Sequence, residues 1–185
     1  MAILTGHGWR RCATAVAAYL MMVAAPLLAQ SPAPLEAELK AVFLFNFAKY
    51  VTWREQSGVS GKGDIRVCTT ANDAFFAMVK SALEGEDIDG RPLVAVALDG
   101  LDDARSCQIL YVGDARTADA KDWFGAVRDG DVLTVGEGAT IEEPVIAFVR
   151  DQNRLRFDIN RAAASRHHLT ISAKLLRLAR RVQER

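Results

Sequence analysis

Two cysteines and two adjacent histidines are the residues of this chain with the widest chemical range. Cys68 and Cys107 could form a disulfide or act as thiols, but neither belongs to a Cys-x-x-Cys motif or has a basic cluster beside it that would favour a reactive thiolate. His167 and His168 could bind a metal ion, yet neighbouring residues of a helix or strand point in different directions, and no third ligand lies at a metal-binding spacing. We therefore interpret the histidines as surface residues and expect no metal site.

A glycine-containing segment at 135–138 (Val-Gly-Glu-Gly) follows an expected strand, as a phosphate-binding loop does. It lacks the third glycine and the Lys-Ser/Thr ending of such loops, and the carboxylate of Glu137 is unfavourable beside phosphate. We interpret it as a turn. The sequence also has no Gly-x-Ser-x-Gly motif with matching histidine and aspartate that would indicate a nucleophile. These patterns predict a protein that is not an enzyme and has no cofactor.

Residues 1–29 are typical of a secretory signal peptide. Arg10 and Arg11 precede an apolar run from 13 to 28, and small residues surround Ala29, after which we expect cleavage. The alternative is a retained membrane anchor, but the run is shorter than the roughly 20 residues that a spanning helix needs. The mature domain would then comprise residues 30–185.

Length and charge narrow the class of protein further. The chain has 185 residues, which fits one domain after removal of the signal peptide. Its 23 basic and 23 acidic side chains balance, so no electrostatic footprint for a phosphate backbone is present. Nucleic acid is therefore not an expected partner.

Export also bears on the cysteines, because only Cys68 and Cys107 would remain after cleavage. An even number of cysteines in an exported chain favours a disulfide over two free thiols. A redox-active pair is the less favoured alternative. We expect a structural bridge that restricts the unfolded chain.

The hydrophobic periodicity alternates between helical and strand patterns along the mature chain. Helices are expected at 35–53, 73–83 with Asn72 as its cap, 118–127, 161–166 and 172–182. Strands are expected at 64–68, 91–98, 108–112, 131–135, 145–149 and 155–159. Strands separated by helices imply a parallel sheet, whereas the last two strands flank a polar turn and form an antiparallel hairpin. The prediction is an α/β fold: a single-domain three-layer sandwich with a mostly parallel sheet, a C-terminal antiparallel hairpin and a C-terminal helix.

The first expected helix is unusually apolar. Positions 35, 39, 42, 43, 46 and 50 share one face, but the apolar residues of 41–48 are too many for one stripe. The helix therefore either lies between layers or contributes to an interface, and we favour the former. Phe43 and Phe47 are assigned to the interior. Asn46, on the same apolar face, would need hydrogen-bond partners there.

A ligand crevice is conceivable where the carboxyl ends of parallel strands converge. The loops concerned are 69–72, 113–114 and 136–138. Their residue types are explained equally well by turns and helix caps, so a small-molecule site remains the alternative interpretation.

Three segments give the chain a resemblance to a known family: the aromatic helix at 39–53, Arg-Phe-Asp-Ile-Asn at 156–160 and Ile-Ser-Ala-Lys-Leu-Leu-Arg-Leu-Ala at 171–179. With these it resembles the YfiR family. The resemblance implies a small periplasmic α/β domain, commonly a homodimer, that binds the periplasmic sensor region of an inner-membrane diguanylate cyclase and represses it. It also implies an outer-membrane lipoprotein that sequesters the regulator. Cys68 and Cys107 match the family's widely shared disulfide.

The chain departs from the family pattern at 142–146, where Glu-Glu-Pro-Val-Ile replaces a second disulfide and a Gly-Gly-Met-Ile-like segment. A histidine kinase is therefore an alternative partner. Among matched positions, Asp158 and Asn160 are the expected partner-contact residues, with Ile146 a weaker candidate. The alternative roles are structural: Asn160 would cap the helix at 161–166, and Asp158 would form a surface ion pair.

Overall fold

The computed structural model describes residues 32–54, 63–70, 73–138 and 143–184. The expected signal peptide and the expected helix cap at Asn72 lie outside these residues. From Ala33 onward the chain forms one structural unit.

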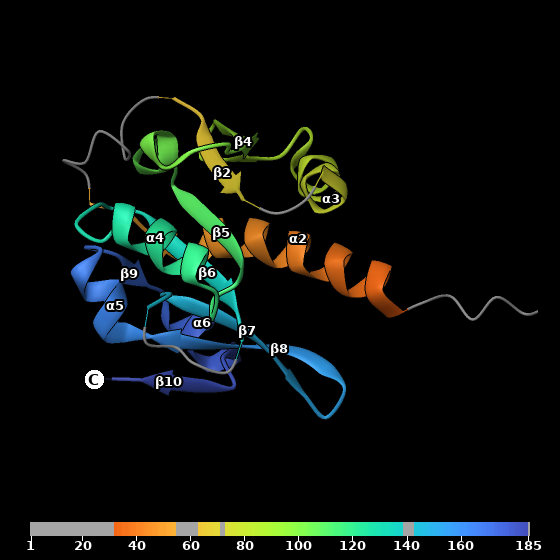
Figure 1. Cartoon of the computed structure of the whole chain (residues 1–185), viewed down its shortest axis with the longest axis vertical. Helices are drawn as coiled ribbons and strands as arrows, with labels where there is room; N and C mark the ends of the chain where they lie inside the picture. The colour runs from red at the N-terminus through yellow and green to blue at the C-terminus, as the bar shows by residue number, and fades with distance from the viewer. Residues whose placement is uncertain (1–31, 55–62, 71–72, 139–142, 185) are drawn as a thin grey trace, which may run out of the picture. The chain divides into compact units, whose positions relative to one another are not determined.

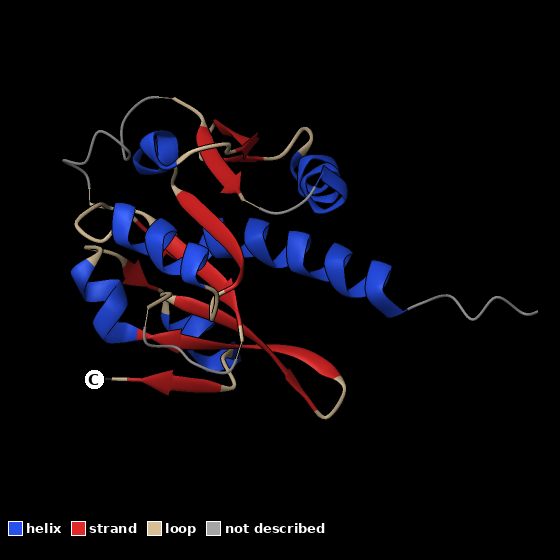
Figure 2. Cartoon of the chain, in the orientation of Figure 1, coloured by secondary structure: helices blue, strands red, loops and turns tan. Residues whose placement is uncertain are grey.

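The main sheet formed by the described residues has eight strands in the order β10-β8-β7-β6-β5-β2-β4-β3. Strands are red in Figure 2. The strands are β2 (Ile65–Thr69), β3 (Asp87–Ile88), β4 (Arg91–Ala97), β5 (Ile109–Asp114), β6 (Leu133–Glu137), β7 (Ile146–Asp151), β8 (Arg154–Asn160) and β10 (Arg181–Gln183). The neighbours from β4 to β7 pair in parallel, whereas β7 and β8 form an antiparallel hairpin. The predicted mostly parallel sheet with a C-terminal hairpin is confirmed.

Helices cover both faces of the sheet (Figure 1). They are α2 (Pro32–Tyr50), α3 (Asp73–Leu83), the 3-10 helix η1 (Leu101–Ser106), α4 (Ala118–Ala126), α5 (Arg161–Arg166) and α6 (Ala173–Leu178). Alternating residues of β5 separate the two cores. Ile109 and Tyr111 belong to the core that contains α2 and α3, and Leu110 and Val112 belong to the core that contains α4 and η1. This is the predicted three-layer arrangement.

The disulfide joins Cys68 in β2 to Cys107 at the entrance to β5, with Cα atoms 5.9 Å apart. Both residues are fully buried, in the core that contains α4 and η1. The predicted pairing is therefore present, and it ties together two strands that are already neighbours in the sheet.

Helix α2 buries a different face from the predicted one. Phe47 is fully buried, and Phe43 is half-buried with its ring centroid 5.8 Å from that of Phe148, so both contact the interior as predicted. Leu35, Leu39 and Val42, however, are 70%, 41% and 48% exposed. Asn46 is half-buried and donates to the carbonyl of Val42 in its own helix. A helix that is apolar on both sides can dock either one, and the side carrying Leu44 and Phe47 forms the core.

The C-terminal helix is shorter than predicted. Helix α6 begins after Ser172, whose side chain accepts from the backbone of Leu175, and ends at Leu178. The backbone then becomes extended at Ala179, and β10 pairs in parallel with β8. The predicted helix to 182 is wrong because the open edge of β8 offers hydrogen-bonding groups that the final residues take up. A two-stranded pairing of β1 (Val51–Thr52) with β9 (Thr170–Ile171) was also not predicted.

Candidate functional site

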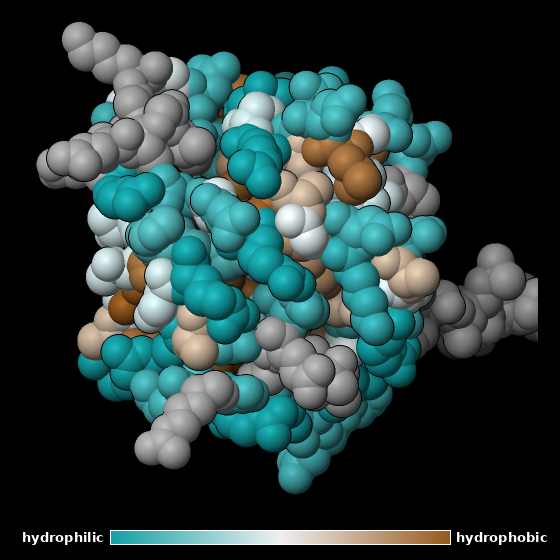
Figure 3. All heavy atoms as spheres, turned by 60° about the vertical axis from the view of Figure 1, so that its left-hand side comes forward, coloured by the Kyte–Doolittle hydropathy of each residue, from teal (hydrophilic) through white to brown (hydrophobic). Residues whose placement is uncertain are grey.

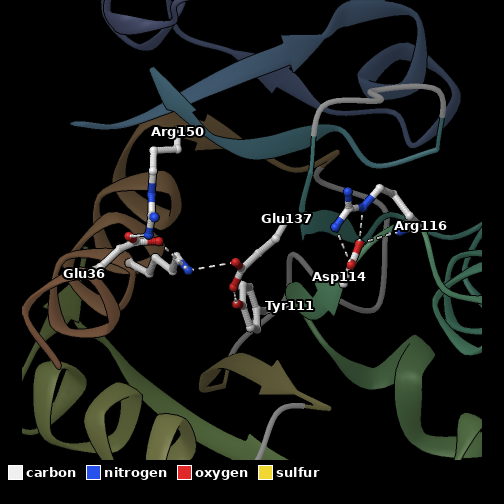
Figure 4. A network of polar contacts seen from close by, with 7 residues as sticks. Glu36, Tyr111, Asp114, Arg116, Glu137 and Arg150 are labelled. Carbon is white, nitrogen blue, oxygen red and sulfur yellow. Dashed lines mark hydrogen bonds and ion pairs between the residues drawn. The ribbon is translucent and has the colours of Figure 1, made fainter. Parts of the chain in front are cut away.

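A network of charged side chains lies at the carboxyl ends of the parallel strands (Figure 4). Its central residue is Glu137, the last residue of β6. One carboxylate oxygen of Glu137 accepts a bond of 2.7 Å from Lys40 of α2, and the other accepts a hydrogen bond from the hydroxyl of Tyr111 in β5. The network therefore connects one helix to two adjacent strands.

Lys40 is the cation at the middle of this network. Its side chain is only 11% exposed, and its ammonium group lies 3.1 Å from Glu36 as well as 2.7 Å from Glu137. A largely buried ammonium group is tolerated only with such partners. Glu36 also pairs with Arg150 near the end of β7, so α2 is fastened to the sheet at two points.

The hydroxyl of Tyr111 is buried in the same network. Burial raises the pKa of Tyr111 far above its ordinary value, and the neighbouring negative charge of Glu137 raises it further. The tyrosine therefore stays neutral and acts as a hydrogen-bond donor over the whole physiological range.

A pocket of about 400 Å³ opens beside the network. Its wall combines apolar side chains of the hairpin with charged side chains of α2, β5, β6, β7 and two loops. The lining includes Lys40, Arg116, Glu137, Phe148, Arg150 and Arg180. At its mouth Arg116 binds Asp114 through two hydrogen bonds of 2.8 and 2.6 Å. These bonds lower the pKa of Asp114 to about 2, so the pair is charged at any physiological pH.

The three loops that the sequence placed around one crevice are divided between two pockets. Asp114 and Gly138 line the larger pocket, whereas Thr70 and Gly113 line a smaller one of about 240 Å³ together with Trp123. Asp114 lines both. The described loop residues therefore do not line the one crevice that the sequence suggested, and the two hollows are separate candidate ligand sites.

Asp158, the first of the predicted partner-contact residues, forms an ion pair whose carboxylate is fully buried. Arg180 donates to both carboxylate oxygens at 2.8 and 2.5 Å, and Arg181 adds a third bond of 3.2 Å. The predicted ion pair exists, but only its arginines reach the surface, with side chains 33% and 56% exposed. This carboxylate also raises the pKa of Arg180.

The other two predicted contact residues also lie in the interior. The side chain of Asn160 caps α5 by accepting from the backbone of Ala163 at 2.9 Å, and the residue is 3% exposed. Ile146 is fully buried opposite Ile159 in the hairpin. The hairpin brings Ile146 and Asp158 onto neighbouring ladder positions, and contact with a partner stays a prediction for all three.

Both adjacent histidines were predicted to be surface residues, and this prediction is wrong for His167. His167 is 3% exposed, its Nδ1 lies 2.9 Å from the carbonyl oxygen of Gly130, and burial lowers its pKa. His168 adopts a left-handed backbone conformation, and its Nδ1 lies 2.8 Å from Asp131. Both rings therefore connect the end of α5 to the last residues of the loop before β6. Within the described ranges no group of three His, Cys, Asp or Glu side chains could hold a metal ion.

Comparison with known proteins assigns the chain to a family. Residues 37–180 match the model of the YfiR/HmsC-like family (DUF4154), and the chain belongs to this family. The family is a regulatory and periplasmic one. No curated protein matches the chain.

Among solved structures, the chain is similar to a conserved domain protein from Vibrio cholerae O1 biovar eltor, with a TM-score of 0.53 and 14% sequence identity. The match covers 80% of this chain and 60% of the other. This likeness concerns the fold alone. Among the helices of the described segments, none is both long and apolar enough to span a bilayer.

Proposed function

We propose that this chain is a periplasmic regulator, exported by a cleaved signal peptide, that binds the sensor region of an inner-membrane diguanylate cyclase and holds it inactive. The match of residues 37–180 to a regulatory family carries this proposal. An outer-membrane lipoprotein that sequesters the regulator would release the cyclase.

A regulator of this kind acts by binding one state of its target more tightly than the other. If the inactive cyclase binds about a hundredfold more tightly, the selectivity is about 2.7 kcal/mol, which shifts a balanced equilibrium almost completely. No catalytic step by the regulator is needed. Deletion of its gene should therefore raise cyclic-di-GMP.

The contact surface that we propose is the arginine pair, Arg180 and Arg181. Asp158 holds both guanidinium groups at the edge of the sheet while remaining buried itself. Asp158, Asn160 and Ile146 would thus contribute to partner binding by fixing the local backbone and the arginine pair, not by touching the partner directly.

Reversing the charge of an exposed arginine tests whether that side chain contacts the partner or is needed only for folding. Arg181→Glu changes a side chain that is 56% exposed, and Arg128→Glu is the matched control because Arg128 is 59% exposed in a surface ion pair with Glu143. We expect Arg181→Glu to raise cyclic-di-GMP toward the level of the deletion strain while the protein still melts cooperatively, because Arg180 continues to neutralise Asp158. Arg128→Glu should leave cyclic-di-GMP unchanged. Cyclic-di-GMP that does not respond to gene deletion, together with altered kinase output, would transfer the proposal to a histidine kinase partner.

Small-molecule binding is the second candidate function, and the pocket of about 400 Å³ beside Lys40 and Arg150 favours it. Pockets of this size with a few convergent polar groups are the usual form of ligand sites. Native mass spectrometry of protein taken directly from the periplasm tests it. A mass equal to that of the bare mature chain under gentle conditions would argue against a resident ligand.

A further inference from the structure

Helix α2 presents an apolar stripe on the side facing away from its own domain. Leu35, Leu39 and Val42 are 70%, 41% and 48% exposed, although residues such as these are normally buried. Half-buried Asn46 and exposed Lys49 continue the stripe toward the end of the helix. We call these five residues the α2 stripe.

The spacing along the α2 stripe alternates between four and three residues, which is the spacing of the a and d positions in a coiled coil. A side chain pattern with this period forms a seam against one other helix. The α2 stripe cannot serve the domain's own core, because the opposite side of the helix, with Ala41, Leu44 and Phe47, already fills it. The fitting occupant is therefore a helix from another molecule.

Exposed large apolar residues elsewhere in the described ranges do not form such a run. They are Val94 in β4, Leu101 in η1 and Leu178 in α6, one on each element. On the face shown in Figure 3, apolar residues occupy small areas separated by hydrophilic ones. The α2 stripe is thus the candidate for an apolar contact.

The charged side chains along α2 indicate which helix would pack on the stripe and in which direction it would run. Glu38 is exposed beside the first half of the α2 stripe, and Lys49 is the last residue of the stripe, so the helix has an acidic side chain toward one end of the stripe and a basic one at the other. A second copy of α2 running in the opposite direction brings each acidic end to the basic end of the other helix. It also aligns the two helix dipoles favourably. A stripe that complements itself in this way fits a two-fold dimer.

We propose that the α2 stripe is the interface of a homodimer, in which the α2 helices of two copies pack antiparallel about a two-fold axis near Val42. This inference rests on the dimeric state that the family resemblance implies, and it adds the surface and the orientation. Leu39 and Val42 would form the centre of the contact, and Glu38 would lie toward the Lys49 end of the other helix.

The first test compares two leucines of equal exposure. Leu39 is 41% exposed in the stripe and Leu101 is 42% exposed on η1, so Leu39→Glu and Leu101→Glu place the same charge at similar depth. The proteins are expressed as full chains, purified from the periplasm and examined by sedimentation velocity. We expect Leu39→Glu to raise the dimer dissociation constant by at least about a hundredfold and Leu101→Glu by less than about threefold.

The outcomes of this test show separately whether the protein is a dimer and whether the α2 stripe is the dimer interface. A monomeric wild-type protein would overturn the inference while leaving repression of the cyclase open to its own genetic test. A dimer that withstands Leu39→Glu would mean that another surface is used. If Leu39→Glu keeps the dimer and abolishes membrane-partner binding, the stripe belongs to the partner and our proposal is wrong.

The second test determines the relative direction of the two α2 helices. Unlike Leu39→Glu, it does not introduce a charge into the apolar contact. In an antiparallel pair centred near Val42, the two Val42 residues face each other, whereas the two Leu35 residues are separated by fourteen residues, or about 21 Å, along the axis. A short bis-maleimide should therefore crosslink Val42→Cys into dimers and leave Leu35→Cys uncrosslinked. Crosslinking of both would indicate parallel helices, and crosslinking of neither would exclude the α2 contact.

Discussion

The ion pair between Asp158 and Arg180 gives the sharpest prediction on stability, because its two members differ in burial. The carboxylate is fully buried and the guanidinium side chain is 33% exposed. Arg180→Ala leaves a buried anion with Arg181 at 3.2 Å as its remaining arginine, whereas Asp158→Ala leaves cations that can turn toward water. Removing one partner of a buried pair costs about 3 to 5 kcal/mol when the remaining charge stays buried.

We therefore expect Arg180→Ala to lower the free energy of unfolding by about 3 kcal/mol and Asp158→Ala by about 1 to 2 kcal/mol, since solvent screens the arginines. The double variant should lose less than the two single losses together, by at least about 1 kcal/mol. Urea unfolding followed by circular dichroism, with the disulfide intact, measures all three. Additive single losses, or a loss below about 1 kcal/mol for Arg180→Ala, would refute the reasoning.

Four further outcomes are expected. Mature protein alkylated without reductant should carry no label on Cys68 or Cys107, and two labelled thiols in folded exported protein would contradict the disulfide. Phe47→Ala should lower the free energy of unfolding by about 3 to 5 kcal/mol, because the ring is fully buried among other aromatic rings; a urea titration showing less than about 1 kcal/mol would be inconsistent with that packing. Lys40→Met should destabilise by about 1 to 2 kcal/mol in the same assay, because the carboxylates that it bridges are left without their ammonium partner but keep some contact with water. Burial depresses the folded-state pKa of His167, so the unfolded chain binds more protons than the folded one below about pH 6.5, and stability should fall as the pH drops through this range. His167→Gln should weaken the dependence of the melting temperature on pH between about pH 5 and 7.

The parts of the fold that local patterns determine could be predicted from the sequence. The alternation of strand-like and helix-like hydrophobic periods predicted the parallel sheet. The polar turn between the apolar runs of β7 and β8 predicted the hairpin. The pairing of Cys68 with Cys107 follows from export and from the count of cysteines. These inferences need only neighbouring residues or composition.

The face that α2 buries could not be predicted, because both of its sides are apolar and only the tertiary contacts of Phe47 decide between them. The end of α6 was missed for a similar reason. Residues 179–183 have acceptable helix formers, and what ends the helix is the hydrogen-bonding edge of β8, which is distant in sequence. Lys40 gave a usable signal, since a lysine inside the apolar run of 39–48 needs a buried partner. Nothing in the sequence indicated that this partner is Glu137, which lies 97 residues away.

The two C-terminal segments that carry the family resemblance form one structural unit. Residues 156–160 are in β8, and residues 171–179 contain α6, after which the chain returns to the edge of β8. Arg181 is in register with Asp158 in the parallel ladder, and both arginines of the pair bond its carboxylate. Because Asp158 belongs to the first segment and its two arginines directly follow the second, the sequence match alone does not distinguish a partner surface from a packing requirement. Arg181→Glu makes that distinction, since the substituted side chain is mostly exposed and Arg180 still neutralises Asp158.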